Sequence, residues 1–227
     1  MSVTLATMRS RVRQRADMEE SEFVQDSELN QYINSSYQEL YDILVTSFED
    51  YYTLPPVSFT IATSTDYYTL PADFYKLRGV DASLDGSTYY YTLMPFDFLN
   101  RNRNNDNLIA ADYSATDRKY RIVGSRIYVT PADNAPGSYR IWYVPSATVL
   151  TSDSSTLDGI NGWEEYVVVD AARKCLDKEE SDTRALVVEK EALRQRIIAA
   201  SARRDAGMPK SISDVNSSVF YNNRRIF

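Results

Sequence analysis

The side chains in this sequence whose chemistry could support catalysis are carboxylates. The 227 residues contain no histidine and one cysteine, Cys175, which excludes histidine-dependent triads, histidine-containing zinc or haem sites and cysteine-pair redox motifs. Paired carboxylates can hydrolyse glycosidic bonds, and the middle of the chain contains Asp66, Asp73, Asp81, Asp85 and Asp97. Their spacing singles out no pair, and most fit turn or cap roles. Neither phosphate-binding glycine motif is present, so the sequence favours a non-enzyme without a metal ion or cofactor.

Charge is distributed unevenly along the chain. The formal net charge is −7, and the stretch from Asp17 to Tyr75 contains 12 acidic residues and no lysine or arginine. Basic residues flank it: Arg9, Arg11, Arg13 and Arg15 before it, and Arg203, Arg204, Lys210, Arg224 and Arg225 near the end of the chain. Such asymmetry is typical of contacts between copies or with an oppositely charged partner. A solvated surface with no partner explains the N-terminal arginines equally well. The net negative charge argues against a grip on DNA.

Helical periodicity predicts two helices at each end of the chain. Their ranges are 4–16, 26–48, 162–180 and 183–204. The first has arginines on both flanks of its apolar stripe. In the last helix we expect the following residues to point inward: Leu186, Leu193, Ile197 and Ala200. An amphipathic pair cannot bury its apolar stripe alone, so the four helices should pack as one bundle.

The middle of the chain is predicted to form strands, because β-branched and aromatic residues are dense and turn signals recur. The predicted strands are 57–62, 67–71, 75–81 and 88–93, followed by a short helix at 95–101 that begins with Pro95 and an exposed loop at 100–118. A hairpin at 119–131 turns at Gly124–Ser125, as a type II′ turn requires. It should pair Ile122 with Ile127 and Tyr120 with Val129. Residues 138–145 would add a third antiparallel strand, giving a small antiparallel sheet or barrel.

Two further features indicate contacts with other proteins. The 18 tyrosines include the clusters 51–52, 67–68 and 89–91, in which one ring can pack inward and its neighbour outward. The alternative is ordinary β-propensity. The last 20 residues show no periodicity but contain the apolar residues Phe220, Tyr221, Ile226 and Phe227. We interpret residues 208–227 as an extended arm that docks into another subunit; a tail folded onto its own body is the alternative.

The predicted fold class is α+β: a helical bundle formed by the N- and C-terminal helices, an inserted antiparallel β-domain and an extended C-terminal arm. The bundle comprises residues 1–54 and 159–207, and the β-rich insert residues 55–158. No apolar run is long enough to span a bilayer, and the N-terminus does not look like a secretory signal. We therefore expect no membrane contact and synthesis in a reducing cytoplasm.

The order of these segments resembles the head-to-tail adaptor (connector) proteins of tailed bacteriophages, particularly those with short tails. The residues that carry the resemblance are NQYINSSYQELYDIL (30–44), YYTLPADFYKLRGVD (67–81), YRIVGSRIYVTP (120–131), the YVP that ends the next strand, and EEYVVVDAARKCLDKEESD (164–182) with the basic helix after it. They are packing and turn patterns and cover most of the chain. The large β-insert departs from the purely helical adaptors.

The resemblance implies a virion protein of the neck, made in the host cytoplasm. It would form a ring, usually of twelve copies, under the portal, with tail nozzle or fibre proteins below and a channel through which genomic DNA passes without sequence-specific binding. The portal-docking residues would be Phe220, Tyr221, Arg224, Arg225, Ile226 and Phe227. Contacts between ring subunits would involve Arg9, Arg11, Arg13, Arg15, Glu19, Glu20 and Glu22. The tail-facing residues would be Tyr89, Tyr90, Tyr91, Asn104 and Asn105.

Two alternatives stay open. A tail component that binds or degrades glycans through carboxylates of the β-insert would explain the clustered tyrosines and aspartates there. A stopper that plugs the exit would share the same architecture.

Overall fold

The computed structural model describes most of the chain. The described residues are 3–20, 22–48, 50–84, 86, 88–98, 118–130, 135–157 and 162–202. In chain order the elements are β1 (Val3–Thr4), α1 (Leu5–Arg15), α2 (Asp26–Ser47), β2 (Val57–Ile61), β3 (Tyr67–Thr69), β4 (Phe74–Ser83), β5 (Tyr90–Thr92), β6 (Met94–Pro95), β7 (Lys119–Val123), β8 (Arg126–Thr130), β9 (Gly137–Pro145), β10 (Thr156–Leu157), α3 (Glu164–Lys178) and α4 (Arg184–Ser201).

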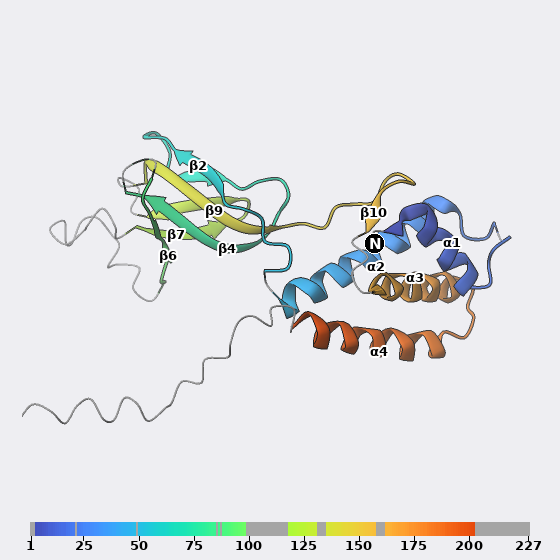
Figure 1. The fold of residues 1–227 in the computed structure, drawn as a ribbon. Helices are drawn as coiled ribbons and strands as arrows, with labels where there is room; N and C mark the ends of the chain where they lie inside the picture. Colours follow the sequence, from blue (N-terminus) through green and yellow to red (C-terminus); the bar gives the residue numbers. More distant parts are fainter. Residues whose placement is uncertain are drawn as a thin grey trace, which may run out of the picture.

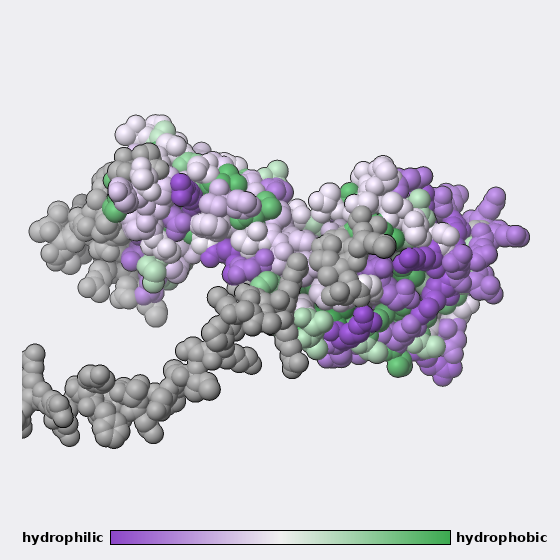
Figure 2. All heavy atoms as spheres, viewed as in Figure 1, coloured by the Kyte–Doolittle hydropathy of each residue, from purple (hydrophilic) through white to green (hydrophobic). Residues whose placement is uncertain are grey.

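The fold is α+β, with helices and strands in separate parts. Figure 1 shows α1–α4 side by side at one end of the molecule and β2–β9 at the other. Each part has its own cluster of buried apolar side chains, one among the helices and one between the sheets. Strongly hydrophilic side chains gather over the helical part, whereas the visible face of the β-part carries mostly residues of intermediate hydropathy (Figure 2).

The predicted apolar stripes build the helical core. Leu5, Met8 and Val12 of α1 are fully buried, and so is Ile33 of α2. In α3, Cys175 lies in the same core, and burial raises the pKa of its thiol to about 11. Helical spacing brings the apolar side chains of each helix to one face, so burying that face holds the helices together.

The outermost helix, α4, is less buried than the sequence predicts. Ile197 is buried and Leu186 and Leu193 pack partly against the core, but Ala200 is exposed. The expectation that Ala200 points inward is therefore wrong. Because α4 packs against α2 and α3 from outside, it covers the core along only one edge.

A buried carboxylate helps to hold α4 in place, since this helix buries little apolar surface. Asp170 of α3 has no exposed surface, and Lys190 of α4 contacts its Oδ1 at 2.8 Å. Ser36 of α2 donates to its Oδ2 at 2.7 Å, and Lys174 contacts the same oxygen at 2.8 Å. One side chain thus binds donors from three helices.

Lys190 links this carboxylate to a second acidic group. Its Nζ also donates to Glu39 of α2 at 2.6 Å, and Tyr166 donates to the same carboxylate at 2.9 Å. Burial alone would raise the pKa of Asp170, but hydrogen bonds from Lys174, Lys190 and Ser36 outweigh it and hold this pKa well below its usual range. Burial tends to lower the pKa of Lys190, yet its bonds to Asp170 and Glu39 raise it above the usual value. Both residues are therefore charged at neutral pH.

The β-part consists of two four-stranded sheets. Their strand orders are β2-β9-β4-β5 and β3-β8-β7-β6. Each edge strand of the first sheet is followed closely in the chain by an edge strand of the second, β2 by β3 and β5 by β6. The two sheets share one apolar core, in which Ile127, Tyr139 and Ile141 are fully buried.

Two expectations about these strands are wrong. Strand β9 does not extend the hairpin β7–β8; it pairs with β2 and β4 in the opposite sheet. The predicted helix at 95–101 is not formed in its described part, because Pro95 lies in β6, which pairs with β7 in parallel. Proline has no N–H to donate, but it is tolerated at the edge of a sheet, as in β6.

The predicted hairpin is confirmed. Ile122 pairs with Ile127 and Tyr120 with Val129. Gly124 has a φ of 58°, and Ser125 is not among the described residues with positive φ. A positive φ at only the first turn residue distinguishes type II′ from type I′, as predicted.

Aromatic rings join the end of α2 to the β-part. The ring of Tyr41 stacks on Tyr52 at 4.4 Å, and its hydroxyl donates to the carbonyl of Pro145 at 2.5 Å. Tyr51 contacts Tyr52 and lies 6.0 Å from Trp163. Both Tyr51 and Tyr52 pack against the helical core, so the expectation that one of this pair points outward is wrong: they lie in the connection after α2 and not on a strand.

Replacing Asp170 by asparagine tests the buried network. The variant keeps the size of the side chain but removes the charge that Lys174 and Lys190 share, and we expect the free energy of unfolding to fall by about 3 kcal/mol. Urea unfolding followed by circular dichroism measures this. The control is D153N, which removes the exposed partner of Arg9 and should cost less than about 1 kcal/mol. Equal costs would contradict a central role for Asp170.

The same network predicts a pH dependence. Because the folded pKa of Asp170 lies below the ordinary value of 3.8, its stabilisation is complete well above pH 3.8 and is lost as the pH falls through and below that value. Urea midpoints measured between pH 6 and pH 2 should fall more steeply for the wild type than for D170N. Parallel curves would show that Asp170 does not drive the acid transition.

Candidate interaction surfaces

The arginines of α1 form ion pairs within the chain. On one flank, Arg9 contacts Asp153 at 2.5 Å and Arg13 contacts Asp26 at 2.8 Å. On the other flank, Arg11 approaches Glu164 of α3 at 3.6 Å. The fourth, Arg15, approaches Glu165 at 3.5 Å and also pairs with Glu189 of α4. The two predicted flanks thus tie α1 to α2 on one side and to α3 and α4 on the other.

The acidic residues predicted for subunit contacts behave differently. Glu19, Glu20 and Glu22 lie in the connection between α1 and α2 and are exposed. Within the described residues, no salt bridge or hydrogen bond engages their side chains. This connection lies at the end of the helical part that is farthest from the strands (Figure 1). It offers three carboxylates to any external partner.

The predicted tail-facing tyrosines do not share one surface. Tyr89 is 67% exposed. Tyr90 of β5 lies under the guanidinium of Arg140, with 3.7 Å between Cζ and the ring centroid. Tyr91 packs against the core of the β-part, as strand alternation requires. Asn104 and Asn105 lie outside the described residues, as do all the portal-docking residues: Phe220, Tyr221, Arg224, Arg225, Ile226 and Phe227.

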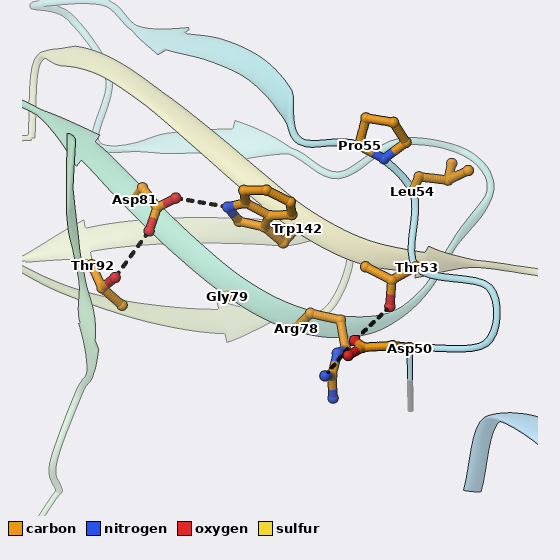
Figure 3. Close-up of a pocket in the computed structure, with 9 residues that line it drawn as sticks. All are labelled: Asp50, Thr53, Leu54, Pro55, Arg78, Gly79, Asp81, Thr92 and Trp142. Atoms are coloured by element: carbon orange, nitrogen blue, oxygen red, sulfur yellow. Dashed lines mark hydrogen bonds and ion pairs between the residues drawn. The ribbon is translucent and has the colours of Figure 1, made fainter. Parts of the chain in front are cut away.

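An open hollow of about 760 Å³ lies where the segment after α2 passes the sheet β2-β9-β4-β5. In Figure 3, the indole of Trp142 and the side chain of Thr92 both point to Asp81. Trp142 Nε1 donates to Asp81 Oδ2 at 2.7 Å, and the Thr92 hydroxyl donates to Oδ1 at 3.2 Å. On the other side, Arg78 pairs with Asp50 at 2.8 Å.

Two of the aspartates that could have supported glycan chemistry have structural partners. Asp81 holds Trp142 and Thr92, and Asp73 accepts a hydrogen bond from the Tyr143 hydroxyl at 3.1 Å. Asp85 lies outside the described residues. Among the described residues, no group of three His, Cys, Asp or Glu side chains could hold a metal ion. In the same part of the chain, no helix is long and apolar enough to cross a membrane.

The structure also shows residues that the sequence did not single out. One of them is Asp170. It could have been recognised in the sequence as the single acidic residue within the apolar run VVVDAA. Arg121 and Arg126 are two more. Strand alternation puts them on the face opposite Ile127, but nothing in the sequence shows which aromatic rings they contact.

A family model for the SU10 adaptor protein matches residues 3–214, nearly the whole chain. No curated protein matches the sequence. The protein belongs to the SU10 adaptor protein family and is a bacteriophage head-to-tail adaptor, a virion component of the head–tail junction.

The two tryptophans provide a test of the hollow. Trp142 is 37% exposed and Trp163 only 4%. We expect acrylamide to quench the fluorescence of W163F, which keeps Trp142, much more strongly than that of W142F, because the quencher must touch the indole. Similar quenching of the two variants would show that the hollow is closed in solution.

Proposed function

We propose that this adaptor forms a closed ring between the portal and the tail, with a channel through which the genome passes. Membership of the adaptor family carries this proposal. The separation of a helical part from a β-part supports it, because the two ends of the molecule can contact different neighbours (Figure 1). In this arrangement the helical part builds the ring, and the β-part faces the nozzle or fibre proteins of a short tail.

A closed ring requires a heterologous contact, in which one surface of a subunit meets a different surface of the next. The exposed carboxylates of Glu19, Glu20 and Glu22 supply one half. For the other half, the side chains of Arg11 and Arg15 keep 43% and 35% of their surface exposed despite their internal ion pairs. A carboxylate of the neighbouring copy can therefore share them. An acidic net charge also favours a channel wall to which DNA does not adhere.

The triple variant E19K/E20K/E22K tests the ring contact. We expect it to fold like the wild type, because these side chains have no partner among the described residues, and to lose ring formation because like charges would then face each other. Native mass spectrometry in the presence of the portal measures ring formation. The matched variant E19Q/E20Q/E22Q should show an intermediate loss. Normal rings from the lysine variant would exclude this surface.

Deleting residues 208–227 tests the proposed portal arm, whose apolar anchors would be Phe220, Tyr221, Ile226 and Phe227, with Arg224 and Arg225 pairing with portal carboxylates. The truncated protein should unfold at the same urea concentration as the full chain but no longer sediment with portal-containing heads. A full-length variant with the four anchors changed to serine separates their role from that of chain length. Undiminished head binding by both proteins would remove the arm from the proposal.

A further inference from the structure

The outer face of the sheet β3-β8-β7-β6 carries a ladder of arginine and aromatic side chains. Strand alternation directs Ile127 and Val129 into the core between the two sheets and leaves Arg126 and Tyr128 on the outside. Arg121 lies directly opposite Tyr128, and Tyr128 directly opposite Tyr67 of the next strand. We call the outward residues Tyr67, Phe96, Arg121, Arg126 and Tyr128 the arginine–aromatic face.

The side chains of this face stack on one another. The Arg126 guanidinium lies 4.3 Å from the Tyr67 ring centroid, and the Tyr67 and Tyr128 rings are 5.6 Å apart. Arg121 lies 5.6 Å from the Tyr128 ring and 5.7 Å from the Phe96 ring. Stacking fixes each guanidinium plane. Arg126 also forms a side-chain hydrogen bond with Tyr128, and the remaining N–H groups of the two arginines can bind a planar acceptor.

Arg121 and Arg126 of this face have no acidic partner among the described residues, whereas most arginines of the helical part have one. Most described arginines pair with a carboxylate of the chain: Arg9, Arg11, Arg13, Arg15, Arg78, Arg173, Arg184 and Arg194. Arg121 and Arg126 are exposed and form no salt bridge with a described residue. The strands β3, β6, β7 and β8 contain three basic residues and no aspartate or glutamate. The strands of this sheet are therefore basic, although the chain as a whole is acidic.

The chemistry of the face defines its partner. Stacked arginines with free N–H edges bind carboxylates in a bidentate manner, and arginine and tyrosine dominate the binding energy of protein interfaces. Nucleic acid fits less well, because three cations on a chain of net charge −7 cannot neutralise a run of phosphates. The acidic connection of a second copy lies at the opposite end of the elongated molecule (Figure 1), so pairing with it would produce end-to-end chains rather than a compact ring.

We propose that the arginine–aromatic face docks a carboxylate-rich surface of a different virion protein on the tail side of the junction. This inference rests on the proposed place of the adaptor between portal and tail. The proposed tail contact is therefore the sheet β3-β8-β7-β6 and not the tyrosines at 89–91 that the sequence analysis predicted.

The variant R121Q/R126Q tests the proposal in two steps. Adaptor-free heads are incubated first with the full-length variant and then with purified tails, and electron microscopy counts the heads that carry adaptors and the heads that carry tails. We expect adaptor binding and thermal stability to match the wild type, while the tail concentration needed for half-maximal attachment rises at least about tenfold. The control R184Q/R194Q removes two other exposed arginines and should attach tails normally.

The outcomes separate the two proposals. Normal tail attachment by R121Q/R126Q overturns the docking face and leaves the adaptor position intact. A variant that fails to join heads but still binds tails also overturns it, because the face would then lie on the portal side. Failure of the wild type to join heads overturns both proposals.

A photo-crosslinker at Val123 identifies what covers the face. Val123 is 53% exposed and lies opposite Arg126. In assembled particles we expect crosslinks to an aspartate- and glutamate-rich segment of another virion protein. Crosslinks to a second copy of this chain or to DNA would overturn the proposal. So would binding of a fluorescent single-stranded oligonucleotide that R121Q/R126Q abolishes.

Discussion

The helical part depends on one buried carboxylate. Asp170 receives donors from α2, α3 and α4, and Lys190 extends the network to Glu39. A buried charge is costly to desolvate, and it is tolerated here because each oxygen has several donors. The outer helix α4 buries few apolar side chains, so its position depends strongly on Lys190. The network also fixes the register between helices that lie more than a hundred residues apart in the sequence.

Charge is used in opposite ways at the two ends of the molecule. In the helical part, the arginines of α1 pair with carboxylates of neighbouring helices and of the segment before β10. The connection after α1 has exposed carboxylates of its own. In the β-part, Arg121 and Arg126 are held by aromatic rings instead of acids. Arg11 and Arg15 would share their charge between a carboxylate of the same chain and one of a neighbour. Arg121 and Arg126 form no salt bridge with a described residue and can pair with a partner's carboxylate alone.

This arrangement suits a head-to-tail adaptor, because a structural link between two assemblies needs separate surfaces on a rigid body. The aromatic contacts of Tyr41, Tyr51 and Tyr52 join the end of α2 to the β-part. Through these contacts the helical part positions the β-part. Asp81 and Asp73 of the β-part hold neighbouring side chains in place, which agrees with a structural role for this family.

The helices, the hairpin at 119–131 and the burial of stripes such as Leu5, Met8 and Val12 can be predicted from local pattern, because periodicity and turn chemistry act between near neighbours. Local pattern does not predict that β9 pairs with β2 and β4, that Arg11 and Arg15 face acidic groups of α3 and α4, or that Asp170 accepts from Lys190. Strand partners and ion pairs join residues far apart in the chain, and local pattern carries no information about which distant group arrives opposite. The arginine–aromatic face depends on both local and long-range structure. Strand alternation directs Arg121 and Arg126 outward, and the pairing of the strands brings aromatic rings next to them.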